Sequence, residues 1–429
     1  RVFNAATEAI TQGGTRRGAN MGILSVDHPD IIQFITAKED PSEFTNFNLS
    51  VAITDEFMSA LEKDEDYSLV NPRTCLETGR MRAKEVFEKI AACAWRSGEP
   101  GVVFIDRIER ANPTPLLGSF EATNPCGEQP LLAYEPCNLG SINLGQMVTG
   151  APCARVVDWD ALAHSVKQSV RFLDDVIEAG RYPTPEIDAM ARGNRKIGLG
   201  VMGFADLLVR LRVRYGSPES FEVAEEVMKF VWEEAWDASR LLAIERGPFP
   251  NIKGSVFDRP GALPVRNATV TTIAPTGTLS IIAGCSSGIE PFFSLSYTRQ
   301  VLNGERIPEV NRLVAEVAKE EGFYSEGLIE HIAAGGAMSE RKEVRERIRD
   351  VFVTAFDIPA EEHIKMQAAF QKHTDNAVSK TINLPPEASV SDVRKAFLLA
   401  WKLGCKGITV YRSGTRAGQV LTCRNPLYC

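Results

Sequence analysis

The chain has 429 residues, of which 44% are hydrophobic and 24% charged, values typical of a folded globular protein. Its 56 acidic residues outnumber its 48 basic residues, and the net charge of −8 argues against duplex nucleic acid as a partner. No apolar run approaches the roughly 20 residues that span a bilayer, and no secretory signal is visible at the start. The 9 cysteines are irregularly spaced without a Cys-x-x-Cys pair, which indicates a reducing cytoplasm and predicts no metal site.

The first distinctive segment is rich in glycine and runs from residue 12 to residue 20. It reads Gln12-Gly13-Gly14-Thr15-Arg16-Arg17-Gly18-Ala19-Asn20. Glycines allow a tight backbone turn, and adjacent arginines offer planar donors suited to phosphate groups or base edges. By themselves these residues fit either a nucleotide-contacting loop or an ordinary exposed turn with two charges.

Strand-like and helical patterns alternate along the chain. We predict strands over residues 21–26, 47–53, 101–105, 138–144, 196–200, 268–274, 379–384 and 407–411. Apolar spacing predicts helices over 84–96, 158–179, 217–246 (one helix or two), 309–321, 361–371 and 391–403, and one over 55–61 with Thr54 as its N-cap. This alternation indicates an α/β protein with mostly parallel strands. We expect one domain over residues 1–412, followed by a tail over residues 413–429.

A central cysteine lies between two prolines in the segment Asn124-Pro125-Cys126-Gly127-Glu128-Gln129-Pro130. The prolines disfavour a helix, and side chains alternate sides along an extended chain. We therefore predict that Asn124, Cys126 and Glu128 project to one side. Together they offer a reactive thiol, an amide that orients a ligand and a carboxylate that accepts a proton. The alternative for Cys126 is a small side chain buried in the core.

A Gly-x-Gly-x-x-Gly pattern occurs at Gly198, Gly200 and Gly203. In a dinucleotide-binding unit, an acidic residue should end a second strand about twenty residues later. Residues 217–226 have a helical pattern instead. We therefore interpret these glycines as positions of close backbone packing.

A second segment rich in glycine and hydroxyl groups spans residues 272–280 and follows a predicted strand. If a helix begins near Thr276, its N–H groups and the hydroxyls would form a phosphate cradle. No Gly-Lys-Ser/Thr follows, so the segment is not a Walker P-loop. A hydroxyl-rich helix cap without a ligand is the alternative.

Together these segments resemble the ribonucleotide reductases, most closely the adenosylcobalamin-dependent (class II) branch. The most specific feature is Asn-Pro-Cys-Gly-Glu-Gln at residues 124–129, with Cys137 eleven residues after Cys126. The other matching segments are 13–22, 28–31, 46–51, 137–144, 195–204, 274–280, 287–291, 380–385 and 406–412. The resemblance implies a ten-stranded α/β barrel of two five-stranded halves, in which a finger loop carries the central cysteine.

The resemblance also implies a radical reaction that makes 2′-deoxyribonucleotides for DNA synthesis. Cys126 would become a thiyl radical that removes the 3′ hydrogen of a ribonucleotide, and Glu128 would accept the 3′-hydroxyl proton. Asn124 would hold the sugar, and Cys137 would be one of two thiols that reduce the intermediate. The substrate, expected to be a diphosphate, would contact these residues. Its further contacts would be Pro125, Gly127, Ser141, Pro275, Thr276, Gly277, Thr278, Leu279 and Ser280.

The same resemblance implies a cofactor and partners. Adenosylcobalamin would generate the radical, and a thioredoxin-like reductant would restore the thiols. A deoxynucleotide or ATP effector would bind the specificity loop, in a protein expected to form a homodimer when full length. The loop consists of Gln12, Gly13, Gly14, Thr15, Arg16, Arg17 and Gly18.

The chain departs from the family pattern at its ends. It begins Arg1-Val2-Phe3 without an initiator methionine, and we expect the other reducing cysteine, early barrel strands and part of the effector pocket to lie upstream. Cys423 and Cys429 are either a counterpart of the family's C-terminal cysteine pair or accidental. Two alternatives stay open: the large subunit of a metal-radical (class I) reductase, and a non-catalytic nucleotide-binding regulatory protein.

Overall fold

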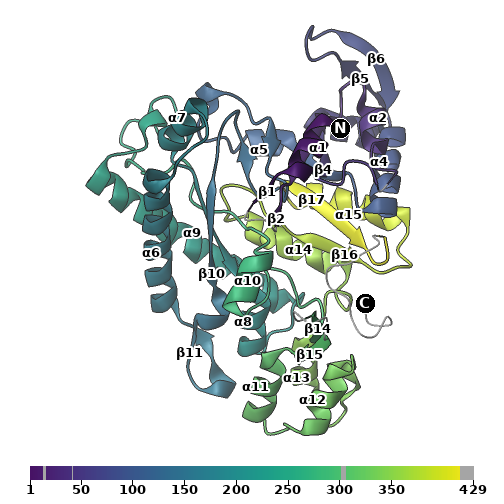
Figure 1. Ribbon diagram of the computed structural model, residues 1–429, viewed down its shortest axis with the longest axis vertical. Coiled ribbons are helices and arrows are strands. Elements are labelled where there is room, and N and C mark those ends of the chain that lie inside the picture. The colour runs from purple at the N-terminus through teal and green to yellow at the C-terminus, as the bar shows by residue number, and fades with distance from the viewer. Residues whose placement is uncertain (13–15, 41, 301–305, 416–429) are drawn as a thin grey trace.

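A computed structural model of the chain describes residues 1–12, 16–40, 42–300 and 306–415. Helices and strands alternate along most of this length, and the helices pack around two groups of strands (Figure 1). The predicted α/β class is therefore confirmed.

The first group of strands is a 5-stranded sheet in the order β16-β17-β7-β4-β3. Its strands are β3 (Asn20–Ser25), β4 (Phe47–Ile53), β7 (Gly101–Phe104), β16 (Thr381–Leu384) and β17 (Gly407–Arg412). β3, β4 and β7 are parallel to one another, and β16 is parallel to β17. β17 and β7 pair antiparallel, which places a reversal of direction inside the sheet.

The second group begins with β10 (Asn138–Asn143) and β13 (Ile197–Met202), which are parallel neighbours. A parallel bridge from Leu199 to Thr271 extends the group, and another joins Ile273 to Val378. Because residue 378 leads directly into β16, the two groups form one continuous wall. In this wall, β10, β13, β16 and β17 therefore run parallel to one another, and β7, β4 and β3 run in the opposite direction. The predicted barrel of two halves has such an arrangement.

The barrel is not closed by the described residues. A ten-stranded barrel needs further strands between β3 and β10, and none of the strands in the described ranges fills that position. The number ten therefore stays a prediction, whereas the two opposed sets of parallel strands are observed.

The predicted strand over residues 268–274 is present only as isolated bridges. The Asp375 carboxylate accepts hydrogen bonds from the N–H groups of Val270 and Thr271, each at 3.0 Å. These amides are therefore satisfied by a side chain, and the segment does not form a regular ladder on that side.

Helices cover the outer faces of the wall. One apolar core packs α6 and α9 against β10 and β13, and another packs α4 and α15 against β4, β7 and β17. The helices are α1 (Val2–Ala9), α2 (Ile31–Thr36), α3 (Asp55–Lys63), α4 (Ala83–Ser97), α5 (Ile105–Glu109), α6 (Trp159–Ala179), α7 (Pro185–Asn194), α8 (Phe204–Leu211), α9 (Pro218–Arg246), α10 (Gly277–Ala283), α11 (Arg312–Glu320), α12 (Glu326–Ala333), α13 (Glu346–Arg349), α14 (Ala360–Gln371) and α15 (Val390–Lys402).

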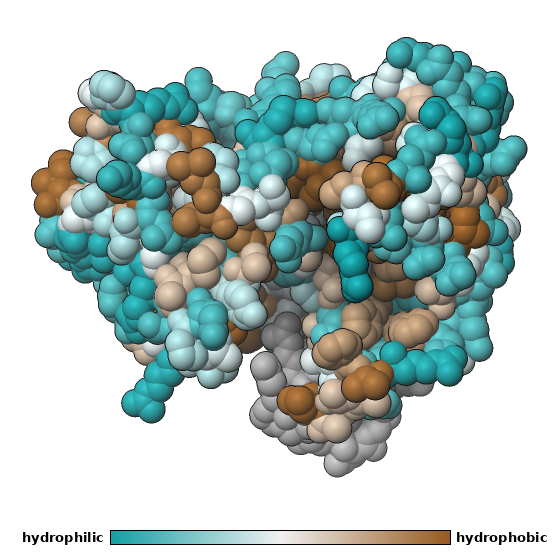
Figure 2. Space-filling model, turned by 90° about the horizontal axis from the view of Figure 1, so that it is seen from above, coloured by the Kyte–Doolittle hydropathy of each residue, from teal (hydrophilic) through white to brown (hydrophobic). Residues whose placement is uncertain are grey.

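Short antiparallel pairs complete the fold. They are β1 (Thr11–Gln12) with β2 (Arg16–Arg17), β5 (Asp66–Val70) with β6 (Glu77–Arg82), β8 (Ala122–Thr123) with β9 (Pro130–Leu131), β11 (Val148–Thr149) with β12 (Val156–Val157), and β14 (Ser296–Gln300) with β15 (Arg306–Val310). The β5–β6 hairpin extends from the body of the molecule (Figure 1). Seen from above, the surface is hollowed between two lobes, and apolar side chains are visible in the hollow (Figure 2).

Most predicted helices are confirmed within a few residues. Thr54 caps α3 as predicted, because its side chain accepts a hydrogen bond from Phe57 N at 3.1 Å. Residues 218–246 form one continuous helix, α9, which Ser217 caps. The predicted helix over 309–321 begins late, because β15 extends to Val310 and Asn311 caps α11.

Candidate active site

The tip of the loop between β8 and β9 is a tight turn. Gly127 N donates to Asn124 O and Gln129 N donates to the Asn124 side-chain oxygen, both at 3.0 Å. Proline in the second position and glycine in the fourth fit a type I turn, and Gly127 has a φ of +82°. The prediction of an extended segment with alternating side chains is therefore wrong, because Asn124 and Gly127 fold it back on itself.

The turn gives Cys126 and Glu128 opposite exposures. Cys126 is exposed at the tip, whereas Glu128 is 2% exposed. The alternative of a cysteine buried in the core is therefore excluded. The structure presents a thiol to solvent and withdraws the neighbouring carboxylate into the protein.

Glu128 is a buried acid with spare hydrogen-bonding capacity. Its Oε2 atom has no hydrogen-bond partner within the described ranges. Burial raises the pKa of the Glu128 carboxyl, and hydrogen bonds from the Asn124 side chain and from its own backbone lower that pKa less strongly. Because an unpaired buried polar atom is costly, this oxygen is suited to receive a hydroxyl group from a ligand.

The backbone of the loop is fixed to the barrel wall. Glu128 O accepts hydrogen bonds from Ala377 N and from Thr272 Oγ1, each at 2.9 Å. Asn48 on β4 donates its side-chain amide to Pro125 O at 2.6 Å. The turn is thus held from both sets of strands, which limits where its side chains can lie.

Cys137 lies directly before β10, and Ser141 lies farther along that strand, opposite Gly200. The residue Cys137 is partly exposed, whereas its thiol is buried, with Sγ 3.8 Å from Lys196 O. Burial raises the pKa of Cys137 to about 12, the charge of Lys196 opposes that rise, and the charges of Glu135 and Glu128 add to it. The structure therefore brings Cys137 into the electrostatic range of Glu128, and the thiol stays protonated at neutral pH.

A buried ion pair at the base of the loop is a feature that the sequence reasoning missed. Lys196 Nζ lies 2.9 Å from Glu135 Oε2 and 3.0 Å from Pro130 O, and both charged side chains are 1% exposed. Asn194 donates to the other Glu135 oxygen at 2.6 Å. The only signal in the sequence is a lysine that directly precedes an apolar strand. The pair ties the start of β13 to the end of the loop.

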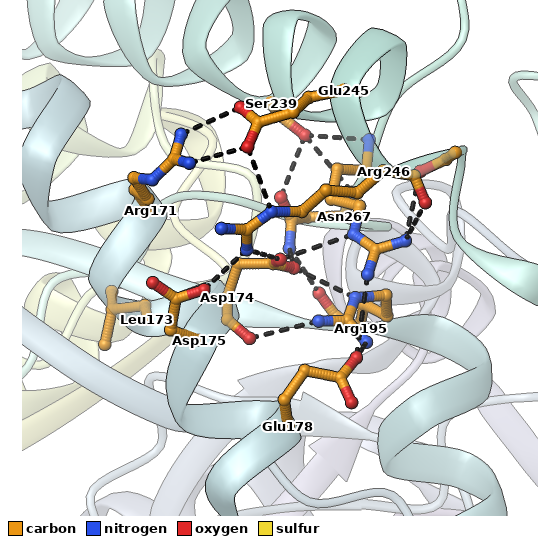
Figure 3. A network of polar contacts seen from close by, with 12 residues as sticks. Arg171, Leu173, Asp174, Asp175, Glu178, Arg195, Ser239, Glu245, Arg246 and Asn267 are labelled. Carbon is orange, nitrogen blue, oxygen red and sulfur yellow. Dashed lines mark hydrogen bonds and ion pairs between the residues drawn. The ribbon is translucent and has the colours of Figure 1, made fainter.

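A larger polar network includes Arg195, the residue before Lys196 (Figure 3). Asp174 on α6 is fully buried, and its carboxylate lies 2.9 Å from Arg195, 3.2 Å from Arg246 and 3.3 Å from Arg266. Removing one member of a buried ion pair typically costs about 3–5 kcal/mol, because the other charge stays buried. The network fixes α6 and α9 against the residues that lead into β13, and thereby positions Lys196.

The glycines of β13 allow another segment to approach closely. A Cβ atom on Gly200 would lie 2.2 Å from Thr272 O, and one on Gly198 would lie 2.5 Å from Gln129 Nε2. Both distances are far below van der Waals contact. The interpretation of these glycines as packing positions, and not as a dinucleotide fingerprint, is therefore confirmed.

The predicted phosphate segment does contain the start of a helix. α10 begins at Gly277, after Thr276 with a φ of +53°. Thr276 Oγ1 accepts a hydrogen bond from Gly288 N at 2.8 Å instead of capping the helix. Pro275 is half-buried and Ser280 is buried, while Gly277, Thr278 and Leu279 are exposed. The helix start is thus confirmed, and phosphate binding stays a prediction.

The specificity loop is described only in part. Gln12 in β1 pairs with Arg16 in β2, whereas Gly13, Gly14 and Thr15 lie outside the described residues. A Cβ atom on Gly18 would lie 2.7 Å from the Thr7 side chain of α1. Arg17 pairs with Thr11 in the same short hairpin, and Gly18 follows it, while effector binding there stays a prediction. Cys423 and Cys429 also lie outside the described residues.

Histidines in the described ranges do not form a metal site. No group of three or more His, Cys, Asp and Glu side chains suited to a metal ion occurs there. His363 is buried, with Nε2 2.9 Å from Ala355 O and Nδ1 3.0 Å from Lys380 Nζ, so both ring nitrogens have partners. Within the same part of the chain, the helices are too short or too polar to cross a membrane.

Comparison with known proteins shows which family this chain belongs to. The chain matches the family described as ribonucleotide reductase, barrel domain, over residues 1–263 and 258–411. The chain belongs to the ribonucleotide reductase family. A reductase of Thermoplasma acidophilum is 48% identical over 423 residues, which cover 98% of this chain and 54% of that protein. A reductase of Mycobacterium tuberculosis is 49% identical over 427 residues, covering 99% and 61%.

Both relatives are named vitamin B12-dependent ribonucleoside-diphosphate reductase. The chain spans less than two thirds of the length of each of these two relatives. Among solved structures, the alpha subunit of a class Id ribonucleotide reductase from Actinobacillus ureae superposes with a TM-score of 0.77. The match covers 96% of this chain and 73% of that one at 21% identity, and it confirms the ribonucleotide reductase type of α/β fold.

Proposed function

We propose that this chain is the barrel part of an adenosylcobalamin-dependent ribonucleoside-diphosphate reductase. One observation carries the proposal: the exposed Cys126 thiol lies two residues from a buried Glu128 carboxylate whose Oε2 lacks a partner within the described ranges. The names of the similar relatives support the diphosphate substrate and the vitamin B12 branch. They favour that branch over a metal-radical large subunit.

The proposed reaction uses the two side chains in sequence. Cys126, as a thiyl radical, takes the 3′ hydrogen atom of the ribose and becomes a thiol again. Glu128 takes the 3′-hydroxyl proton, and the 2′-hydroxyl leaves as water with a proton from a reducing thiol such as Cys137. A raised pKa makes the Glu128 carboxylate a better base near neutral pH. Asn124 shapes the turn and places its amide beside that carboxylate.

Cys137 is the proposed donor of one of the two reducing equivalents. Because burial raises its pKa to about 12, the group stays a thiol that can give up its hydrogen. A thioredoxin-like reductant would restore it after each turnover. The second reducing thiol is expected from the upstream part of the protein.

The cofactor proposal fits the position of Cys126. Adenosylcobalamin supplies, when bound, the radical that oxidises the Cys126 thiol. A thiol at the exposed tip of a fixed loop is accessible to such a group, whereas a thiol in the core is not. Because cobalamin carries its cobalt within its own ring, the site needs no cluster of protein metal ligands.

The remaining contacts are proposed by position. The substrate phosphates would bind the exposed start of α10 at residues 277–279, together with Pro275, Thr276 and Ser280. Ser141 on β10 would complete the sugar site. A deoxynucleotide or ATP effector would bind residues 12–18 near the interface of a homodimer, in a cytoplasmic protein.

The direct test is an assay of the full-length protein with a ribonucleoside diphosphate, with and without adenosylcobalamin. We expect deoxynucleotide formation only with the cofactor. Glu128→Gln should lower kcat by about 10²–10⁴-fold, the usual contribution of a positioned base, with little change in KM. Glu121→Gln, an exposed carboxylate beside the same loop, is the matched control and should leave kcat unchanged.

Other outcomes would reject the proposal in different ways. Turnover that needs a radical-generating partner subunit, and not adenosylcobalamin, would indicate a metal-radical reductase. Nucleotide binding without any turnover would indicate a regulatory protein. An unchanged kcat in Glu128→Gln would remove Glu128 from the reaction.

A further inference from the structure

A cavity of about 810 Å³ lies among α9, the end of α14, the start of β17 and the loop over residues 256–263. None of the proposed catalytic residues lines it. Its volume falls within the roughly 300–1,000 Å³ that is usual for small-molecule sites. The cavity is therefore large enough for a ligand and separate from the candidate active site.

Cationic side chains outnumber carboxylates in the lining of this cavity. The cationic and titratable nitrogen side chains that line it are Arg110, Arg240, Arg259, Lys372, His373 and Lys406. Asp375 is the one carboxylate in that lining. Its oxygens already accept hydrogen bonds from Trp232 Nε1 at 2.8 Å and Thr271 N at 3.0 Å. Lys372 forms an ion pair with Glu225, and Lys406 Nζ donates to the backbone oxygens of Asp375 and Asn376, so only part of the positive charge is available to an anion.

The cations differ in how far they are already paired. Arg110 lies 2.6 Å from Asp55, and Arg240 lies 2.5 Å from Asp237. Arg259 is exposed on the loop and has no carboxylate partner within the described ranges. Guanidinium groups bind phosphate and carboxylate groups through two parallel hydrogen bonds. Arg259 is thus the cation best placed to take up an anionic group.

Three aromatic rings, those of Trp232, Trp236 and Phe257, form one wall of the cavity, the aromatic wall. Trp232 Nε1 and Trp236 Nε1 both donate to Asp375 Oδ1, at 2.8 Å and 3.2 Å. The Trp236 and Phe257 ring centroids are 5.2 Å apart. Because a hydrogen bond holds each indole, the rings need little further ordering to contact a flat ligand.

We infer that this cavity binds a small anion that carries a flat ring, with a nucleoside phosphate as the closest biological class. The aromatic wall contacts the ring, and Arg259 with the neighbouring cations contacts the phosphate. Base–aromatic contacts tolerate different bases because every base offers a π face. The site therefore selects for a ring and a negative charge together.

Titration of tryptophan fluorescence with adenosine diphosphate tests the inference in the intact protein, because Trp232 and Trp236 line the cavity. We expect saturable quenching by adenosine diphosphate, and at least about ten-fold weaker binding of adenosine or of inorganic phosphate. Arg259→Glu should weaken the diphosphate response at least ten-fold. Trp159→Phe should leave it intact, because Trp159 packs against Phe230 outside the cavity.

Arg181→Glu is the matched charge control, since Arg181 is also exposed and does not line the cavity. Equal thermal midpoints of Arg259→Glu and wild type verify that the variant is folded. Quenching that is absent in wild type, or equal in wild type and Arg259→Glu, would overturn the site. Equal binding of phosphate alone would overturn the role of the aromatic wall. Retained reductase activity in Arg259→Glu would separate this cavity from the proposed active site.

Discussion

The cysteine thiols of this chain differ in how strongly burial suppresses their ionisation. Burial raises the pKa of Cys137 and Cys405 to about 12 and that of Cys285 to about 11. Cys126 and Cys75 are exposed. Because the thiolate is the reacting species, we expect iodoacetamide to label the two exposed thiols at least about ten-fold faster at pH 8. Peptide mass spectrometry measures this, and equal labelling of Cys137 and Cys126 in the native protein would contradict it.

His363 makes the stability of the fold depend on pH. Burial, reinforced by the charge of Lys380, lowers its pKa to about 3, against about 6.5 in an unfolded chain. The unfolded state therefore binds the proton more readily. The free energy of unfolding should fall as pH drops from about 6.5 toward 3, by at most about 1.4 kcal/mol per pH unit from this group.

Urea unfolding of wild type and His363→Gln between pH 7 and pH 4.5 measures that contribution. Glutamine can still donate to Ala355 O and accept from Lys380, so the variant should fold. We expect a shallower loss of stability in the variant as pH falls. Parallel pH profiles for the two proteins would show that His363 is not the responsible group.

At the scale of elements, β13 and the segment at Thr272 approach too closely for a side chain. Gly200→Ala would place a Cβ atom 2.2 Å from Thr272 O, so the backbone would have to move. We expect a loss of about 1–3 kcal/mol or more in the free energy of unfolding. Gly79→Ala in β6 is the control, because nothing lies within 4 Å of its Cβ position. Equal stability of the two variants would refute the close packing.

The elements also show where local sequence patterns suffice. Helices such as α4, α6 and α15 follow from apolar spacing alone, which predicts them within a few residues. The turn at residues 124–127 was not, because the Asn124 side chain and Gly127 override the preference of a proline-flanked segment for an extended form. The β5–β6 hairpin was missed because β6 is rich in charged residues and lacks apolar alternation.

At the scale of the whole molecule, the site depends on contacts between distant parts of the chain. Glu128 O is held by residues 272 and 377, and Lys196 by Glu135 and Pro130. No local pattern reveals such pairs, so the sequence could propose candidate site residues but not the residues that support them. The cavity beside Trp232 was missed for the same reason, since its lining comes from several separate segments.

The most direct test of the central claim is the turnover of Cys126→Ser in the full-length protein, measured beside Cys75→Ser. Both substitutions replace an exposed thiol with a hydroxyl of similar size. We expect Cys126→Ser to bind the ribonucleotide and form no deoxyribonucleotide, whereas Cys75→Ser should turn over like wild type. Deoxyribonucleotide formation by Cys126→Ser at the wild-type rate would contradict the account.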